Sequence, residues 1–334
     1  MADLDRGRYV AEIVALADQL LSDGVPVGDL KIAVGALSEM RQAFRVFASY
    51  RGIRKVSAFG SARTHEGDPV FRLAEEFARR IADNGYMVIT GAGPGIMEAC
   101  QRGAGRERSF GVDIRLPFEQ QANSIISGDP KHMSFRFFFT RKLFFIKEAD
   151  GIVLFPGGFG THDEGFETLT LLQTGKSRPL PLVLLDRPHG TYWKQWQRYV
   201  EDHLLRRSMI DKEDLALYTV TDDVDVAVNT ITGFYRVYHS SRYVGDLFVI
   251  RLTRRLPDSF VAELAAKFAD ILSDGVITQR SALRAERSEK EIADLPRLVM
   301  RFDRLHYGRL RMLIDQLNEA PEEEAAAVAD TTGS

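Results

Sequence analysis

A glycine-rich segment beside a carboxylate is the part of this 334-residue chain best suited to chemistry. Residues 155–164 read FPGGFGTHDE, between an apolar run at 151–155 that predicts a buried strand and a following helical pattern. Glycines at a strand-to-helix junction let backbone N–H groups approach an anion, and the helix dipole favours negative charge there. Glu164 adds a carboxylate in what we predict to be the first helical turn. The segment therefore predicts chemistry on a phosphorylated ligand.

Two further small-residue turns follow predicted strands. One is the glycine turn at residues 91–95 (GAGPG), and the other is Gly60-Ser61-Ala62. Ligands of open parallel sheets bind outside the carboxyl ends of the strands, so all three turns are expected on one edge of the sheet. Ser61 is expected to donate a hydrogen bond to phosphate or ribose there. Together the turns favour a nucleotide or phosphate site over glycine used only for tight turns.

A dinucleotide site is one alternative for the turn at residues 91–95. Its spacing departs from G-x-G-x-x-G, because Gly95 comes one residue early and position 96 is Ile. Asp113, in the next predicted strand, stands where an acid that binds ribose would lie in a dinucleotide fold. No pair of residues suited to hydride transfer is evident, but a dehydrogenase stays open as an alternative.

Two adjacent cations, Arg141 and Lys142, lie on a predicted helix at residues 135–147 that is rich in phenylalanine. The phenylalanines are expected to pack this helix onto the sheet. Arginine offers a planar fork for phosphate or carboxylate, and lysine offers a point charge. In isolation, a solvated face on an amphipathic helix would be the better explanation of both cations. Their position directly before the strand that leads into the acidic loop favours a role in the site.

These motifs together resemble the LOG (Lonely Guy) family, whose members are also widely labelled lysine decarboxylase-like. The resemblance rests on Arg141-Lys142, on residues 156–164, and on residues 90–99 (TGAGPGIMEA), and it covers roughly residues 55–235. Family members are homodimeric phosphoribohydrolases. They cleave the N-glycosidic bond of a nucleoside 5′-monophosphate, such as AMP or a cytokinin nucleotide, to free base and ribose 5-phosphate. The resemblance implies this activity, a nucleoside monophosphate substrate, a homodimer and no cofactor.

Carried over residue by residue, the resemblance implies that Arg141 and Glu164 are the catalytic pair. Arg141 would neutralise phosphate or assist the departing base, whereas Glu164 also has a structural alternative as an acid that stabilises a helix N-terminus. Asn123 stands where the family has a substrate-binding acid. With Ser61, the residues expected at the substrate are Lys142, Gly157, Gly158, Phe159, Gly160, Thr161, Thr170, Gly91, Gly93, Gly95, Met97 and Asn123.

Two other functions are alternatives to the hydrolase. Amino-acid decarboxylation needs pyridoxal phosphate on a lysine, with an acid paired to the pyridine nitrogen. Lys142 and Lys147 are the only lysines near the loops, and no such acid is evident, so we reject a decarboxylase. A non-catalytic nucleotide-binding or carrier protein on the same fold remains the alternative, with the C-terminal unit sensing or regulating.

The order of the elements predicts an α/β fold with a doubly wound, Rossmann-like parallel sheet at residues 51–240, because strands and helices alternate there. Residues 1–50 have the apolar spacing of helices. Residues 241–318 predict a small α+β unit in the order β-α-β-β-α, a truncated ferredoxin-like unit. Residues 319–334 are acidic and of low complexity, which predicts a disordered tail.

Composition limits the partners and the location. The net charge of −3 gives no reason to expect nucleic acid, and no apolar stretch reaches the ~20 residues that span a bilayer. The chain starts without a signal-peptide pattern, and the single cysteine, Cys100, excludes an internal disulfide and is expected to pack in a helix. We therefore expect a cytoplasmic protein. The histidines lack paired ligand spacing, so no metal is expected, and His162 is expected at a loop surface.

Overall fold

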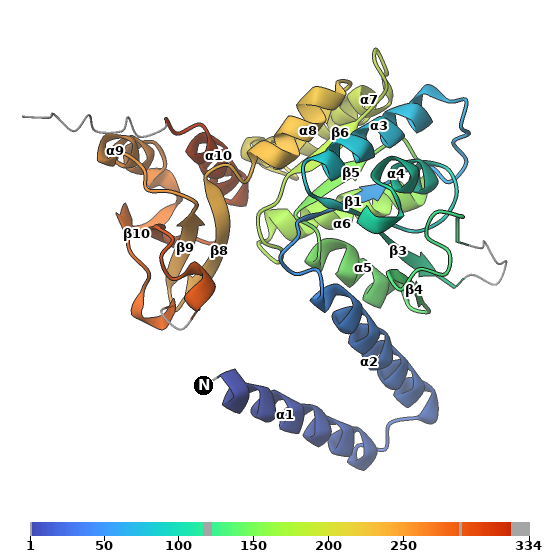
Figure 1. Ribbon diagram of the computed structural model, residues 1–334. Coiled ribbons are helices and arrows are strands. Elements are labelled where there is room, and N and C mark those ends of the chain that lie inside the picture. Colours follow the sequence, from blue (N-terminus) through green and yellow to red (C-terminus); the bar gives the residue numbers. More distant parts are fainter. Residues whose placement is uncertain (1, 116–121, 287–288, 322–334) are drawn as a thin grey trace, which may run out of the picture.

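A seven-stranded parallel sheet in the order β4-β3-β2-β1-β5-β6-β7 forms the centre of the computed structural model (Figure 1). The structure describes residues 2–115, 122–286 and 289–321. The strands are β1 (Lys55–Phe59), β2 (Met87–Thr90), β3 (Ser109–Ile114), β4 (His132–Phe135), β5 (Gly151–Leu154), β6 (Leu182–Leu185) and β7 (Tyr218–Thr221). The predicted α/β class, with a doubly wound parallel sheet, is confirmed.

Helices cover both faces of this sheet, and each face has its own apolar core. They are α3 (Pro69–Asp83), α4 (Ile96–Ala104), α5 (Phe138–Lys147), α6 (Phe159–Gln173), α7 (Tyr192–Tyr199) and α8 (Val224–Gly233). Phe144 of α5, Leu172 of α6 and Trp193 of α7 belong to one core. Phe77 of α3 and Cys100 of α4 belong to the other. Cys100 is fully buried, as expected, and burial raises the pKa of its thiol.

The chain reverses its order along the sheet between β1 and β5, which lie side by side at its centre. At such a switch point the loops after the two strands diverge and leave a crevice for a ligand. All residues of β1, β2, β5 and β6 are buried, which is why these strands form unbroken apolar runs in the sequence. The crevice therefore lies at the ends of fully buried strands.

Two short edge strands depart from the sequence prediction. The predicted helix at 135–147 begins only at Phe138, because His132–Phe135 pairs with β3 as strand β4. Strand β7 was not predicted at all. Both strands have four residues and are partly exposed, so they lack the apolar run that marked the central strands.

The first two helices, α1 (Ala2–Ser22) and α2 (Val27–Ala48), extend away from the sheet (Figure 1). The second half of α2 is anchored by Ala43 and Phe47, which are buried in the core beneath α5. No residue of α1 whose side chain is described is buried. None of the described helices is apolar over a length that could cross a membrane.

The C-terminal residues form a four-stranded antiparallel sheet in the order β10-β11-β9-β8, with two helices. The elements are β8 (Tyr238–Val244), β9 (Leu247–Leu252), α9 (Asp258–Lys267), β10 (Leu272–Arg280), β11 (Arg297–Phe302) and α10 (Tyr307–Asn318). The α+β class is confirmed: β9, α9, β10, β11 and α10 stand in the predicted order β-α-β-β-α, and one further strand, β8, precedes them. The polar strand β8 was missed, and it spans the predicted boundary at residue 240. Of the predicted disordered tail, residues 322–334 lie outside the described residues.

Close backbone contact fixes α10 against the sheet domain. A Cβ on Gly308 would lie 2.4 Å from the carbonyl oxygen of Glu213, which belongs to a short helical turn. The buried guanidinium of Arg311 lies 3.4 Å from the carbonyl oxygens of Leu180 and Leu217. The described residues also form a π-helix, η2 (Val200–Leu205), and short 3-10 helices: η1 (Arg106–Arg108), η3 (Lys212–Leu217), η4 (Ala269–Ile271), η5 (Arg284–Glu286) and η6 (Lys290–Ile292).

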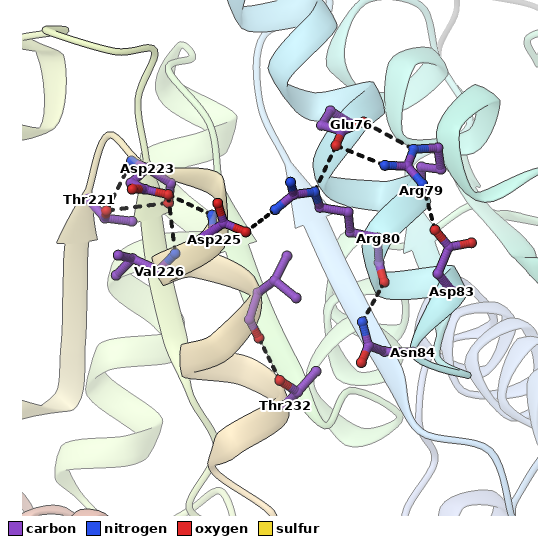
Figure 2. Close-up of polar contacts among 11 residues, drawn as sticks. Glu76, Arg79, Arg80, Asp83, Asn84, Thr221, Asp223, Asp225, Val226 and Thr232 are labelled. Carbon is purple, nitrogen blue, oxygen red and sulfur yellow. Dashed lines mark hydrogen bonds and ion pairs between the residues drawn. The ribbon is translucent and has the colours of Figure 1, made fainter.

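Ion pairs on the surface connect α3 to α8 (Figure 2). Arg80 bridges Glu76 on its own helix, at 2.7 Å, and Asp225 on α8. Asp223 accepts the backbone N–H of Asp225 at 2.7 Å and so begins α8. Exposed pairs of this kind contribute at most about 1 kcal/mol each, so apolar packing rather than charge holds these two helices on the sheet.

Helix α4, which follows the second glycine turn, packs directly on α3. A Cβ added at Gly103 would lie 2.0 Å from the carbonyl oxygen of Glu75, so the two backbones touch. Gly103→Ala should therefore lower the free energy of unfolding by about 1–3 kcal/mol in chemical denaturation, because a helix backbone has to move. Gly28→Ala in α2 is the matched control, since nothing lies within 4 Å of its added methyl. Equal stabilities of the two variants would contradict this packing.

Candidate functional site

A cleft of about 870 Å³ opens at the carboxyl ends of β1, β2 and β5, with α5 and α6 as walls. Many of the predicted site residues line it. They are Glu164, Arg141, Ser61, Gly91, Met97, Gly157, Gly158, Phe159, Gly160 and Thr161. The sheet thus brings together residues that lie about a hundred positions apart in the sequence, as the switch-point rule leads one to expect.

The three turns pack on one another through the backbone of Ser61. Its N–H donates to the carbonyl of Pro156 at 3.2 Å, and its carbonyl accepts from the N–H of Ile96 at 3.1 Å. A Cβ on Gly95, whose φ is +69°, would lie 2.4 Å from that same carbonyl oxygen. A Cβ on Gly157 would lie 2.1 Å from Oγ1 of Thr161 and 3.0 Å from the Ser61 nitrogen. These glycines are needed because the turns touch.

Helix α6 begins at Phe159 and presents its N-terminus to the cleft. Among the described residues, no acceptor is bonded to the backbone N–H groups of Gly158, Phe159 and Gly160. Free N–H groups and the positive end of the helix dipole together form an anion site. The loop therefore has the geometry of a phosphate cradle, and the hydroxyl of Ser61 can add a donor beside it.

Glu164 is the sixth residue of α6 and lies in its second turn, so the expected position in the first turn is wrong. Helix-dipole stabilisation by an acid is confined to the first turn, so it does not account for this residue. Glu164 is buried, and its Oε2 has no hydrogen-bond partner among the described residues. Burial raises the pKa of its carboxyl to about 7, although Lys142 and Arg141 act to lower it. An unpaired buried acid in a cleft is typical of a functional group.

The side chain of Arg141 extends from α5 into the cleft, and two contacts hold its guanidinium in place. Its Nε donates to the carbonyl of Val112 at 3.0 Å, and its guanidinium lies 5.0 Å from the ring of Phe145. A Cβ on Gly91 would lie 2.6 Å from Nη2, so a side chain at this position would displace the guanidinium. Burial lowers its pKa, but an arginine remains charged. No ion pair joins Arg141 to Glu164, although both line the cleft, so both remain available to a ligand.

Lys142 does not line the cleft. Its Nζ lies 2.8 Å from Oδ2 of Asp163 and 2.8 Å from Oε2 of Glu167, and so it ties α5 to α6. Burial would lower the pKa of Lys142, but hydrogen bonds to these two carboxylates raise it overall. Its position supports the helix that carries Glu164, and direct contact with a nucleotide stays a prediction.

Asn123 lies behind the second glycine turn. Its Nδ2 donates to the carbonyls of Ala92, at 3.1 Å, and Gly93, at 2.9 Å, and to Oε1 of Gln101, at 2.6 Å. These bonds hold the turn in shape and leave the side chain outside the lining of the cleft. The remaining predicted residues that do not line it are Gly93, Gly95 and Thr170, whose hydroxyl donates to Phe166 of its own helix.

Several residues that line the cleft were not assigned from the sequence. Arg63 directly follows the Ser61 turn, which was a usable signal, whereas Phe138 was interpreted as a packing residue and is half-exposed. Phe159 is 96% exposed at the mouth of the cleft. His162 does not lie on a loop surface as expected. It belongs to α6, is half-buried, and its Nε2 lies 2.7 Å from the hydroxyl of Tyr192.

Two alternative kinds of site find little support. Asp113 does not line the cleft, and its Oδ2 lies 2.8 Å from Nε2 of His132. Burial opposes ionisation of Asp113, but the hydrogen bonds from His132 and Ser134 lower its pKa overall. The acid on which a dinucleotide site depended is thus engaged elsewhere. Within the described ranges, no three His, Cys, Asp or Glu side chains are grouped to hold a metal ion.

The family comparison agrees with this site. Residues 96–231 match the family model described as "Possible lysine decarboxylase", a label under which LOG proteins are widely grouped. The matched segment contains α5, the acidic loop and α6, and so includes both Arg141 and Glu164. The predicted resemblance to the LOG family is confirmed for this part of the chain.

Several solved structures are similar to about half of this chain. The structural genomics target TM1055 is 24% identical, covers 53% of this chain and 97% of its own, and has a TM-score of 0.38. The Moco carrier protein from Chlamydomonas reinhardtii is 19% identical, with 53% and 93% covered and a TM-score of 0.36. DNA processing protein A from Helicobacter pylori is 14% identical, with 53% and 79% covered and a TM-score of 0.38. No curated protein matches the chain. At such TM-scores these likenesses do not bear on function.

The buried carboxyl of Glu164 should make stability depend on pH. Its pKa is about 7 in the folded protein against 4.5 in the unfolded chain, so between these values only the folded state keeps the proton. The free energy of unfolding therefore falls as pH rises through this window, by roughly 3 kcal/mol, and is level above it. The Glu164→Gln variant has no carboxyl to titrate, so its free energy of unfolding should not fall in this window. Urea unfolding at pH 5 and pH 8 should show the variant gaining stability relative to the wild type, and parallel pH profiles would contradict the burial.

Proposed function

We propose that this protein is a cytoplasmic phosphoribohydrolase that cleaves the N-glycosidic bond of a nucleoside 5′-monophosphate, AMP-like or a cytokinin nucleotide. The products are free base and ribose 5-phosphate. The observation that carries the proposal is the buried, unpaired carboxyl oxygen of Glu164 in a cleft that also contains a free helix N-terminus and Arg141. The family match over residues 96–231 supports it, and the single cysteine supports the location.

The phosphate of the substrate would bind at the N-terminus of α6. The N–H groups of Gly158, Phe159 and Gly160 supply donors, and the hydroxyls of Ser61 and Thr161 line the same wall. Holding the phosphate there fixes the ribose relative to Glu164, which lies one turn further along the same helix. Such positioning supplies a large part of the rate enhancement in many enzymes, because the reacting groups no longer have to find one another.

The carboxyl of Glu164 would act at the glycosidic carbon. Cleavage passes through an oxocarbenium-like state, which a carboxylate stabilises while it orients or deprotonates the attacking water. Water adds to C1′, and the base departs with the electron pair of the broken C–N bond and takes up a proton. A pKa of about 7 keeps a useful fraction of Glu164 ionised at neutral pH and still able to accept a proton. Arg141 would neutralise the phosphate or assist the departing base.

The remaining predicted residues divide by their position. Those in the cleft wall would contact the nucleotide: Ser61, Gly91, Met97, Gly157, Gly158, Phe159, Gly160 and Thr161. Lys142 and Asn123 would act from behind, through α6 and the second glycine turn. We therefore propose substrate contact for the first group and support of the site for the second.

The activity named in the family description fits this cleft poorly. Pyridoxal phosphate chemistry needs a lysine amine in the site to form a Schiff base. No lysine is among the described residues that line the cleft, and Lys142 is engaged by two carboxylates. A carrier protein that binds a nucleotide without cleaving it remains the second candidate, because the anion site alone would serve it.

Purified protein should release base and ribose 5-phosphate from at least one of AMP, GMP, CMP, UMP and a cytokinin monophosphate. Glu164→Gln keeps the shape of the side chain but cannot ionise, so kcat should fall at least about 100-fold while nucleotide still binds. Because the ionised form acts, kcat/KM of the wild type should fall about tenfold per pH unit below pH 7 and level off above it.

The matched control is Glu263→Gln, an acid on α9 in the C-terminal unit, which should keep full activity. Turnover of no nucleotide, or full activity in Glu164→Gln, would show that the proposed mechanism is wrong. Tight binding without turnover would favour the carrier.

We also propose a homodimer that forms through α1, α2 and α5. Large apolar side chains are exposed on all three helices, and patches of this kind mark interaction surfaces. They are Tyr9, Val10, Ile13, Val14, Leu16 and Leu21 on α1, Val27, Ile32, Val34, Leu37 and Phe44 on α2, and Phe138, Phe139 and Leu143 on α5. The same surface of a second copy would cover them, because a two-fold interface pairs like with like. Helix α5 carries Arg141, so the interface would adjoin the site.

The mass in solution, from light scattering after gel filtration, should correspond to two chains. Phe139→Glu places a charge on the exposed face of α5 and should shift the protein toward one chain, because burying an unpaired charge is costly. Val276→Glu, at an apolar residue of β10 that is 65% exposed, is the matched control and should leave the mass unchanged. A wild type of one-chain mass would contradict the proposal.

A further inference from the structure

Tyr192, the first residue of α7, contacts the acidic loop from the side away from the cleft. Its hydroxyl donates a hydrogen bond to the carbonyl oxygen of Gly157. The same hydroxyl lies 2.7 Å from Nε2 of His162. Tyr192 does not line the cleft, whereas Gly157 and Gly158 do, so the loop lies between Tyr192 and the ligand site. Neither Tyr192 nor His162 takes part in the chemistry proposed above.

The bond from Tyr192 sets the direction of one peptide group. In a trans peptide the C=O and the following N–H point in opposite directions, and the described chain contains no cis peptide. Because the Gly157 carbonyl points to Tyr192, the N–H of Gly158 points away from it, toward the cleft. That N–H has no acceptor among the described residues. Two adjacent glycines leave this peptide intrinsically free to turn, so an external contact has to hold it.

His162 orients the hydroxyl that makes this contact. A carbonyl only accepts, so the single hydrogen of Tyr192 is committed to Gly157, and Nε2 of His162 must be the donor to the hydroxyl oxygen. Burial lowers the pKa of His162, which fits a neutral ring with its hydrogen on Nε2. The backbone N–H of His162 also donates to the carbonyl of Gly158 at 3.2 Å. His162 thus connects Tyr192 to the same helix N-terminus.

Tyr192 is itself firmly placed. Its backbone N–H donates to Oδ2 of the buried Asp186 at 2.9 Å, and its ring packs edge-on against Trp193, with centroids 4.8 Å apart. The other oxygen of Asp186 accepts the N–H of Arg187 at 2.8 Å, which fixes the loop between β6 and α7. The hydroxyl therefore acts from a rigid base.

We propose that Tyr192 and His162 are positioning residues of the anion site, and that they aim the Gly158 N–H at the phosphate of a ribose 5-phosphate group. Tyr192 lies outside the cleft lining and acts only through the Gly157–Gly158 peptide, whereas His162, which lines the cleft, acts through the hydroxyl of Tyr192. The proposal rests on the phosphate site of the proposed function, but not on hydrolysis, because a carrier protein would need the same donor.

Tyr192→Phe removes the hydroxyl and keeps the ring. The Kd for ribose 5-phosphate, from calorimetry, and the KM for a nucleotide that is turned over should each rise about tenfold, because one aimed hydrogen bond to a charged group is lost. The value of kcat should change less than about twofold, since Glu164 is untouched. His162→Gln, whose amide can donate where Nε2 does, should bind more tightly than His162→Ala. Tyr199→Phe, at a half-exposed tyrosine on the same helix, is the matched control.

The outcomes separate this proposal from the hydrolase. An unchanged Kd in Tyr192→Phe, or an equal loss of kcat and affinity, overturns the positioning role. A wild type that binds ribose 5-phosphate but cleaves no nucleotide removes only the hydrolase, and the Kd comparison still decides the role of Tyr192. A wild type that binds neither ribose 5-phosphate nor inorganic phosphate removes the anion site and both proposals with it.

Discussion

The contact among three turns at the switch point of the sheet is the constraint on which the site depends. The backbone of Ser61 accepts from the turn after β2 and donates to the loop after β5, and Gly95 and Gly157 have no space for a side chain. Glycine in these turns thus has two effects. It lets the turns touch, and it leaves the N-terminus of α6 open to an anion.

Burial of Glu164 is the second feature that the fold imposes, and it acts against stability. A carboxyl whose pKa is raised to about 7 costs free energy at neutral pH, and no structural contact of its Oε2 compensates for that cost. Lys142 offsets part of it by bringing a positive charge close while it holds α5 to α6. Proteins retain such groups where function requires them, at the expense of stability.

Residues outside the cleft lining determine how the turns and helices that line the cleft are held. Asn123 holds the second turn, Lys142 joins the two helices that carry Arg141 and Glu164, and Tyr192 holds the Gly157 carbonyl. Lys142 belongs to a motif by which the chain resembles the LOG family, and Asn123 stands where that family has a substrate-binding acid. From sequence position alone, both would be taken for substrate ligands. Their position relative to the cleft distinguishes residues that support the site from residues that can contact a ligand.

The sequence by itself determined the fold class, because buried parallel strands are unbroken apolar runs and helices have their own apolar period. It also located the glycine turns, Arg141 and Glu164. It missed β4, β7 and β8, since partly exposed strands without an apolar run take their form from pairing with neighbours. Only the tertiary structure decided that Glu164 is buried without a partner and that Asn123 faces away from the cleft. Burial and hydrogen bonding depend on segments far apart in the chain, and local sequence patterns do not record them.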